Sequence, residues 1–248
     1  MRLPWLQPGD PFPDPARAWD ERQPAPGLLA AGGALDVDTL RRAYSNGIFP
    51  WFSDDQPILW WSTDPRMVLY TGEFRLHRSL RKTLARLLRD PGFEIRFDHD
   101  FARVIRACAG SPRNGQSGTW IVPDMVEAYV NLHRAGYAHS VETWIDGELA
   151  GGLYCVAIGR AVFGESMFTR VPDASKLALA ALVAWCRQAG VALIDCQQNT
   201  SHLASLGARE IARADFVQHL ARVTPEETPR WQFLPVYWNA LLRMPASE

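Results

Sequence analysis

The sequence carries almost no net charge, because its 26 Lys and Arg nearly cancel its 27 Asp and Glu. A field that recruits nucleic acid by net charge is therefore excluded, and any contact with RNA must come from a local patch. Long apolar runs are also missing: the longest, residues 177–186, is about half of the ~20 residues that cross a bilayer. The first fifteen residues lack a basic leader followed by an apolar run. We therefore expect a cytoplasmic protein with no membrane-spanning segment.

Cysteine is scarce, and the four residues stand singly among apolar neighbours at positions 108, 155, 186 and 196. This spacing matches neither a zinc site nor a redox pair, so we expect buried, reduced thiols and no bound metal. The sequence also lacks a glycine-rich phosphate loop, a His-Glu-x-x-His pattern and a Gly-x-Ser-x-Gly elbow. These absences argue against nucleotide-binding loops, zinc proteases and α/β-hydrolases. We interpret His202, which has no nucleophile near it in the sequence, as structural.

The apolar residues alternate between helical and strand spacing. Helices are expected over about residues 36–47, 76–89, 101–108, 123–136, 173–189, 201–206 and 215–222. Strands are expected over about residues 94–97, 139–145, 149–158, 161–163 and 191–194, and near residue 210. This order predicts an α+β fold similar to the N-acetyltransferase superfamily, that is, GNAT-like. We expect a small N-terminal module over residues 1–70, followed by a catalytic domain over residues 71–248 with a mixed sheet flanked by helices.

Two acids follow predicted strands. Glu165 comes after the strand at 161–163, and Asp195 ends the strand at 191–194. Gln197 stands two positions after Asp195, so in an extended chain both side chains share one face. That pair could hold and polarise an amine, or it could cap the next helix. A lone Glu at a strand end is more often a surface group, so Glu165 by itself decides nothing.

Seven aromatic residues form a set that core packing alone would commonly explain: Tyr44, Phe49, Trp51, Phe52, Trp60, Trp61 and Trp120. However, residues 49–54 follow neither period and contain a proline, within an irregular stretch that reaches residue 61. We therefore expect that these rings do not all share one packed face and that some stack on a base, each contributing ~1 to ~3 kcal/mol.

The predicted helix at 76–89 is amphipathic. Its apolar face carries four leucines, Leu80, Leu84, Leu87 and Leu88, and its other side is basic. Such a face is most often only solvated, but it can also bind RNA phosphates. The candidates for this role are Arg78, Arg81, Lys82 and Arg86.

An ordered series of motifs resembles the leucyl/phenylalanyl-tRNA-protein transferase family. The N-terminal motifs are Gly27-Leu28-Leu29-Ala30, Gly32-Gly33, Ala43-Tyr44, Gly47-Ile48-Phe49-Pro50-Trp51-Phe52, Trp60-Trp61-Ser62 and Asp64-Pro65-Arg66. The later motifs are Gly118-Thr119-Trp120-Ile121, Glu127-Ala128-Tyr129, Ala138-His139-Ser140-Val141-Glu142, Gly164-Glu165-Ser166-Met167-Phe168, Ala174-Ser175-Lys176, Ile194-Asp195-Cys196-Gln197 and Ser205-Leu206-Gly207-Ala208. They keep their order from about residue 27 to residue 208, and chance does not produce such a series.

The resemblance implies a reaction. The donor would be leucyl-tRNA or phenylalanyl-tRNA, with methionyl-tRNA used less well, and the acceptor a protein that begins with Arg or Lys. The acceptor's α-amine would attack the aminoacyl ester, and the ribose hydroxyl of the terminal adenosine would leave. No cofactor is needed. The product would carry an N-terminus that marks it for degradation, an N-degron.

The resemblance also suggests roles for particular residues. Asp195 and Gln197 would bind and orient the attacking amine, with Asp195 taking up or relaying its proton. Glu165 would contact the aminoacyl end of the donor. An apolar pocket for the Leu or Phe side chain would be lined by Leu153, Met167 and Ile194. The candidates to hold the terminal adenosine are Trp51 and Trp120, with Tyr44 and Tyr129 nearby.

Three other functions stay open at this point. A CoA-dependent N-acyltransferase would use the same fold, but Arg170-Val171-Pro172-Asp173 stands where a pyrophosphate-binding turn is expected. A glycoside hydrolase could use Glu165 and Asp195 with tryptophan platforms, although the expected cytoplasmic location disfavours it. A non-enzymatic RNA-binding module would explain the aromatic and basic residues, but it leaves the acids and Gln197 without a role.

Overall fold

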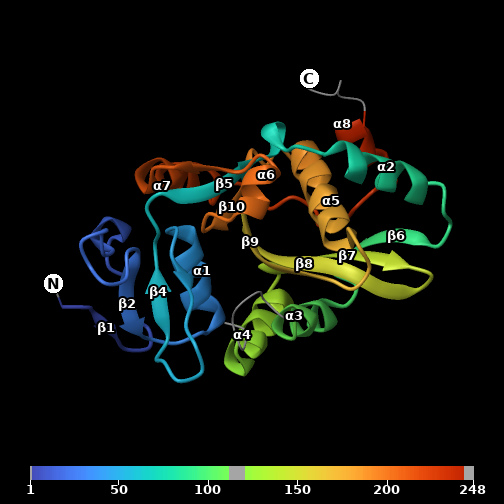
Figure 1. Ribbon diagram of the computed structural model, residues 1–248. Coiled ribbons are helices and arrows are strands. Elements are labelled where there is room, and N and C mark those ends of the chain that lie inside the picture. The colour runs from blue at the N-terminus through green and yellow to red at the C-terminus, as the bar shows by residue number, and fades with distance from the viewer. Residues whose placement is uncertain (1, 112–120, 243–248) are drawn as a thin grey trace.

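The computed structural model describes residues 2–111 and 121–242. Figure 1 shows a small sheet at the N-terminal end beside a larger sheet that has helices on both of its faces. The prediction of an α+β fold, with a small module before a mixed sheet flanked by helices, is confirmed. Within the described residues, no helix is both long enough and apolar enough to cross a bilayer.

The small sheet contains four short strands: β1 (Trp5–Leu6), β2 (Leu28–Gly32), β3 (Phe49–Pro50) and β4 (Leu59–Trp61), in the order β1-β2-β4-β3. The chain also forms a 3-10 turn at η1 (Pro15–Arg17) and the helix α1 (Val37–Ser45), which the carboxylate of Asp36 caps. The prediction of an irregular stretch over residues 49–61 is wrong at both ends, because Phe49 pairs with Trp61 and Pro50 with Trp60. Proline fits there because β3 is an edge strand.

The larger sheet contains seven strands: β5 (Arg66–Tyr70), β6 (Phe93–Phe97), β7 (Ala138–Ile145), β8 (Glu148–Ile158), β9 (Ala161–Thr169), β10 (Leu193–Gln197) and β11 (Arg209–Ile211). Their order is β11-β5-β10-β9-β8-β7-β6. Strands β9 and β10 run parallel, and the other neighbours run antiparallel. Although β5 falls within the first 70 residues, it lies in this sheet, so the chain changes sheets between Trp61 and Arg66.

Two predicted strands have different bounds in the structure. The strand expected at 161–163 continues to Thr169, and the strand expected at 191–194 is shifted to Leu193–Gln197. Glu165 and Asp195 therefore lie inside strands and not after them. The apolar pattern misses this because neighbouring strands pair with polar residues: Tyr154 is opposite Ser166, and Val68 is opposite Asp195.

The predicted helices are confirmed as α2 (Arg78–Leu87), α3 (Phe101–Ala109), α4 (Pro123–Arg134), α5 (Ala174–Ala189), α6 (Ser201–Ser205) and α7 (Arg213–Val223). Short turns follow β5 and precede the C-terminus at η2 (Thr71–Glu73), η3 (Pro235–Trp238) and α8 (Asn239–Leu242). One detail of α2 is corrected. Leu88, expected on its apolar face, lies just beyond the helix and is 40% exposed.

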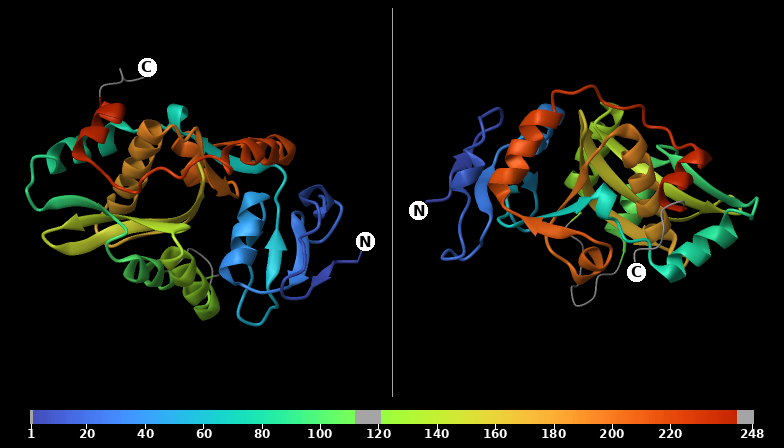
Figure 2. Two further views of the ribbon diagram at one scale, coloured as in Figure 1. Left: turned by 180° about the vertical axis from the view of Figure 1, so that it is seen from behind. Right: turned by 90° about the horizontal axis from the view of Figure 1, so that it is seen from above.

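Helices cover the larger sheet on both faces, with α5 on one side of the strands and α3 and α4 on the other (Figure 2). Each face has its own core cluster: Tyr129 and Phe163 belong to the α1/α3/α4 face, and Leu153 and Ile194 to the α5 face. The C-terminal tail packs on the α5 face through Trp231, whose ring stacks on His139 at 4.0 Å between centroids. All four cysteines are free thiols. Cys108, Cys155 and Cys186 are buried, as expected, whereas Cys196 is partly exposed.

Candidate active site

The parallel pairing of β9 and β10 is short, and each strand has a β-bulge just beyond the paired residues. Ile194 and Asp195 pair with Val162 and Phe163. Beyond them, Glu165 is the extra residue of β9 against β8, because Gly164 and Ser166 face consecutive residues of that strand. Cys196 is likewise the extra residue of β10 against β5. A bulge redirects side chains from the ordinary alternation, and here two bulges lie side by side.

Asp195 is fully buried and forms a two-bond ion pair with Arg66 of β5. Its Oδ1 accepts from Arg66 Nε at 2.8 Å, and its Oδ2 accepts from Arg66 Nη2 at 2.6 Å. The third guanidinium nitrogen donates to the carbonyl of Gly47 at 3.1 Å, just after α1. The guanidinium also packs over the rings of Phe49 and Phe216, at 4.8 and 4.7 Å from their centroids. This environment holds Asp195 as a fixed, paired carboxylate.

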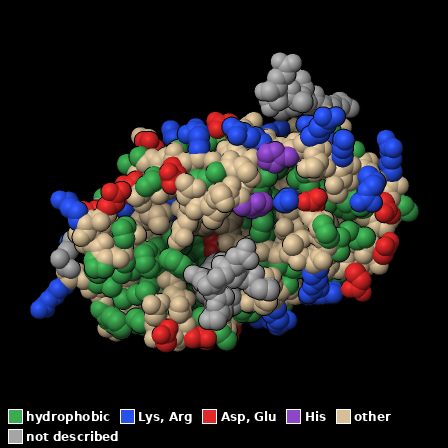
Figure 3. All heavy atoms as spheres, in the orientation of Figure 1, with side chains coloured by type: hydrophobic (Ala, Val, Ile, Leu, Met, Phe, Trp, Pro, Cys, Tyr) green, Lys and Arg blue, Asp and Glu red, His purple; other side chains and the backbone are tan. Residues whose placement is uncertain are grey.

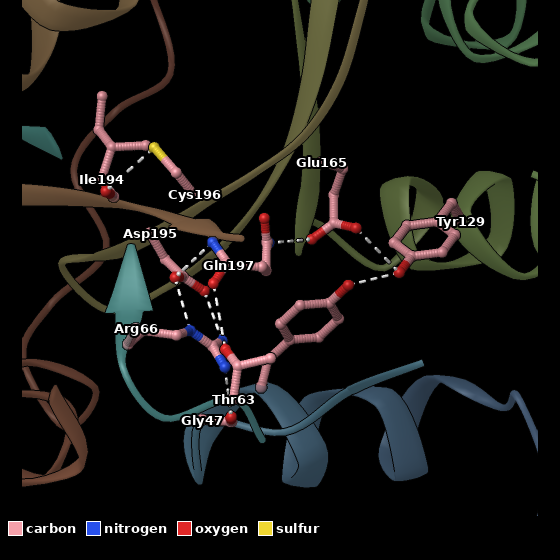
Figure 4. Close-up of polar contacts among 10 residues, drawn as sticks. Gly47, Thr63, Arg66, Tyr129, Glu165, Ile194, Asp195, Cys196 and Gln197 are labelled. Atoms are coloured by element: carbon pink, nitrogen blue, oxygen red, sulfur yellow. Dashed lines mark hydrogen bonds and ion pairs between the residues drawn. The ribbon is translucent and has the colours of Figure 1, made fainter. Parts of the chain in front are cut away.

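Gln197 connects this pair to Glu165 (Figure 4). Its backbone N–H donates to Asp195 Oδ1 at 3.0 Å, and its carbonyl accepts from the Thr63 hydroxyl at 3.1 Å. These bonds hold Gln197 at φ 55°, a conformation that side-chain-bearing residues rarely adopt. Its side-chain amide then donates to Glu165 Oε1 at 3.2 Å across the gap between β10 and β9. Strain of this kind is typical of functional sites.

Glu165 is bound on its other side by a pair of tyrosines. The Tyr129 hydroxyl donates to Glu165 Oε2 at 3.3 Å, and Tyr44 is hydrogen-bonded to Tyr129. Burial raises the pKa of Glu165 to about 8, and the Asp195 charge adds to this, although hydrogen bonds from the tyrosines and the Arg66 charge oppose it. Burial also raises the pKa of both tyrosines well above the usual range, so their hydroxyls stay protonated. Glu165 is thus an acid that titrates near neutral pH.

The predicted adenosine-binding residues have different environments. Tyr44 and Tyr129 are fully buried, so neither ring offers a face to a base, and both lie behind Glu165 instead. Trp51 is partly exposed and packs at 5.3 Å from Trp61, whose indole donates to the Trp51 carbonyl. Trp120 lies outside the described residues. Of the four candidates, the structure leaves Trp51 with an accessible ring.

Most of the aromatic set is core. Phe49, Phe52 and Trp60 are buried together with Tyr44 in one cluster. The expectation that the rings cannot share a packed face is therefore wrong for these four, while Trp51 and Trp61 are partly exposed and Trp120 lies outside the described residues. Sequence spacing failed here because β3 and β4 bring residues 49 and 61 opposite each other and fold the irregular loop between them back on itself.

The three residues predicted to line an apolar pocket lie together on the α5 face. Leu153 and Met167 are opposite each other on β8 and β9, and Ile194 is in the same core cluster on β10. Met167 is the partly exposed member. The pocket candidates and the acids thus lie on opposite faces of the sheet.

Sequence reasoning quoted Arg66 within a motif but gave it no role, and it missed Thr63 entirely. The available signal was an arginine at the start of the strongly apolar run Met67–Tyr70. A charged residue in a buried strand needs a partner, which is commonly an acid. Nothing in the sequence indicates which acid, because β5 and β10 are separated by more than one hundred residues.

The basic residues of α2 lie apart from this site. Arg78, Lys82 and Arg86 are exposed, and Arg81 donates to the carbonyl of Leu242 at 3.2 Å. Figure 3 shows basic side chains gathered over α2, on the same face as a hollow near the centre of the molecule. This basic surface could contact an extended polyanion whose end lies elsewhere.

Comparisons with known proteins agree with the geometry. A family model described as leucyl/phenylalanyl-tRNA protein transferase matches residues 68–221, and the model of its N-terminal domain matches residues 33–64. The chain belongs to this family. A leucyl/phenylalanyl-tRNA–protein transferase from Polaromonas sp. is 67% identical over 240 residues, covering 97% of this chain and 94% of the relative. The transferase from Albidiferax ferrireducens is 64% identical over 240 residues, covering 97% of this chain and 94% of the relative.

A third relative, from Burkholderia vietnamiensis, is 59% identical over 231 residues and covers 93% of this chain and 91% of its own. The chain is therefore an enzyme of the transferase class that moves aminoacyl groups from tRNA to proteins.

Solved structures resemble it weakly. FemX has a TM-score of 0.41 at 11% identity, covering 73% of this chain and 70% of that chain. A GCN5-related N-acetyltransferase from Kribbella flavida has a TM-score of 0.34 at 14% identity, covering 67% and 57%.

Proposed function

We propose that this enzyme transfers Leu or Phe, and Met less well, from aminoacyl-tRNA to the α-amine of cytoplasmic proteins that begin with Arg or Lys. The product is an N-degron. The observation that carries the proposal is the chain of contacts from Arg66 through Asp195 and Gln197 to Glu165, at the point where two parallel strands separate. It combines a fixed ion pair, a positioned amide and an acid with a pKa of about 8.

Orientation supplies much of the rate. Aminolysis of an ester runs downhill, and holding amine and ester in line contributes about 7 to about 11 kcal/mol in favourable cases. We assign this positioning to the Gln197 side chain, whose backbone is fixed on both sides by Asp195 and Thr63. Since the amide nitrogen donates to Glu165, we assign the amide oxygen to accept from the amine.

The proton released by the amine needs an acceptor. Asp195 was the expected acceptor, but both of its oxygens are occupied by Arg66 and it is closed to solvent. We therefore assign Asp195 to positioning, because it accepts from the Gln197 N–H and so fixes the backbone that carries the amide. We assign the uptake of the proton to the ionised form of Glu165, which predominates above its pKa of about 8, so transfer is expected to speed up as pH rises towards that value. Glu165 would also contact the aminoacyl end of the donor.

We assign the choice of amino acid to an apolar pocket in which Met167 is the accessible side chain, because Leu153 and Ile194 are buried in the core cluster that Met167 packs against. A pocket of this kind distinguishes one methylene by only about 1 to about 3 kcal/mol, so some use of Met is expected beside Leu and Phe. Trp51, with its accessible ring, is our candidate to stack on the terminal adenosine. Phosphates farther along the tRNA would contact Arg78, Arg81, Lys82 and Arg86 of α2.

The test mixes the enzyme with radiolabelled leucyl-, phenylalanyl- or methionyl-tRNA and a peptide that begins with Arg, with Lys and Gly peptides alongside. Label on the Arg and Lys peptides alone supports the donor, the acceptor and the reaction together. Asp195→Ala is expected to abolish transfer while leaving tRNA binding intact, which separates an enzyme from an RNA-binding module. Equal labelling of the Gly peptide would contradict the acceptor rule. No label with any donor would make acetyl-CoA the next donor to try.

A further inference from the structure

A basic cavity lies beside α3, separate from the acids described above. Its volume is about 660 Å³, and it is formed by one side of α3, the residues that follow this helix and the end of β9. Its lining includes Arg103, Arg106 and Arg170 as the cations, Asp100 as the acid, and the hydroxyls of Ser111 and Thr169. Figure 3 shows Lys and Arg side chains over α3, at the lower edge of the hollowed face.

Two of the three arginines have no compensating acid among the residues that the structure describes. Arg103 forms an ion pair with Glu148 at 3.3 Å, and Asp100 caps α3 by accepting from the Arg103 N–H. For Arg106 and Arg170, the part of the chain that the structure describes offers no carboxylate within ion-pair distance. Arg170 is nevertheless held in place, because it donates to the Leu149 carbonyl at 3.3 Å. A cavity with two uncompensated guanidinium groups favours an anion.

The hydroxyl groups of the lining are already committed as donors. Ser111 Oγ donates to the Ala107 carbonyl at 2.8 Å, and Thr169 Oγ1 donates to the Val171 carbonyl at 2.8 Å. Their remaining capacity is to accept. The donors that a ligand can use in this cavity are therefore the guanidinium groups, and a ligand that only accepts, such as a phosphodiester, fits that set.

The cavity lies on the strand that carries Glu165. Thr169 is the fourth residue after Glu165 on β9, and at about 3.3 Å per residue this places the two about 13 Å apart. Stacked nucleotides rise by about 3.4 Å each, so the same distance corresponds to roughly four nucleotides. An RNA strand whose last nucleotide reaches Glu165 can therefore bring its preceding phosphates to the cavity.

We propose that this cavity binds phosphodiester groups of the single-stranded 3′ end of the donor tRNA through Arg106 and Arg170. The inference rests on the proposed function. The acceptor is a poor occupant, because a peptide that begins with Arg or Lys is repelled by the positive charges of Arg106 and Arg170. The contact would be additional to that of α2, which lies on the other face of the sheet with α5.

The test compares two donors that differ in phosphate. Phenylalanyl-tRNA carries the phosphates, and the phenylalanyl ester of adenosine carries none. Arg106→Glu is expected to raise KM for phenylalanyl-tRNA roughly three- to tenfold at low salt and to leave the adenosine ester unaffected. The slope of log affinity against log salt should fall by about 0.7 per lost contact. Arg170→Gln should act in the same direction, and Arg106→Lys should retain most of the affinity.

The control is Arg17→Glu, which makes the same charge change at an exposed arginine of the small module. Affinity for uncharged tRNA, measured by fluorescence anisotropy, gives a readout that does not need transfer. If Arg106→Glu weakens neither binding nor transfer more than Arg17→Glu does, the cavity is not a phosphate site. An equal loss with both donors would also overturn it. If Arg106→Glu weakens tRNA binding but the wild-type protein transfers no amino acid, the proposed function is wrong and the phosphate site in the cavity is supported.

Discussion

Arg66 and Asp195 join β5 to β10 through two hydrogen bonds in a place closed to solvent. Removing one partner of such a pair leaves a buried charge without compensation, which costs about 3 to about 5 kcal/mol. We expect Arg66→Met to lower the free energy of unfolding by this amount in urea denaturation. Arg41→Met, which breaks an exposed pair with Asp38, should change it by less than about 1 kcal/mol. A similar small change in both variants would show that Asp195 is solvated after all.

Glu165 makes stability depend on pH. Its carboxyl holds its proton up to about pH 8 in the folded state, against a reference value of 4.5. Between these values the folded state binds a proton that the unfolded state has lost, so the free energy of unfolding falls as pH rises from about 4.5 towards 8. Glu165→Gln cannot titrate and should remove this part of the fall. Urea titrations between about pH 5 and pH 8 measure it.

The matched control for this measurement is Glu227→Gln, at an exposed glutamate of the C-terminal tail. Its pH profile should follow that of the wild type. Parallel profiles for wild type and Glu165→Gln would mean that Glu165 ionises normally and would contradict the raised pKa.

The backbone of Gln197 separates stability from activity. At φ 55° a residue with a Cβ is strained by about 1 to about 2 kcal/mol, and glycine is not. The free energy of unfolding of Gln197→Gly should therefore exceed that of Gln197→Ala by about 1 kcal/mol in urea denaturation. Both should lose most of the transfer activity, because both lack the amide. Full activity in the glycine variant would show that the side chain is not needed for positioning.

Gly151 sets the distance between β8 and the start of α5. A Cβ at this position would lie 2.7 Å from the Cβ of Ala174 and 3.0 Å from the backbone nitrogen of Ser175. Gly151→Ala should force the helix to shift and cost about 1 to about 3 kcal/mol in unfolding experiments. Gly72→Ala, where a Cβ meets nothing within 4 Å, is the control and should be close to neutral. Equal stability of the two variants would contradict close packing at Gly151.

Periodicity predicted the helices and the central meander because their apolar residues follow the faces that are buried. Helix α5 and the hairpin at Asp146-Gly147 are examples, since each is specified by local sequence. The strands of the small module were missed because β1, β3 and β4 have only two or three residues, and β2, with five, is buried throughout and shows no alternation. The strand ends near Glu165 and Asp195 were misplaced because long-range pairing, and not local hydrophobicity, extends β9 and β10.

The site was predicted in part for the same reason. Asp195 and Gln197 stand two residues apart, so the sequence could associate them, and the family resemblance drew attention to Glu165. Arg66, Thr63 and Gly47 act on them from distant parts of the chain, and no local pattern indicates such contacts. The burial of Tyr44 and Tyr129 likewise depends on how α1 and α4 pack, which single-sequence reasoning does not reach.

The small module contributes directly to the candidate site through contacts made by Gly47, Tyr44 and Thr63. All three belong to the first 63 residues, yet they hold Arg66, Tyr129 and Gln197 in place. The candidate site is therefore formed by residues of the small module together with residues of the larger sheet and its helices. A chimera that joins the small module of one relative to the remaining chain of another brings together contact residues that did not evolve together. The loss of activity in such chimeras should therefore follow the number of mismatched contacts between the two parts, and not the overall identity of the two relatives.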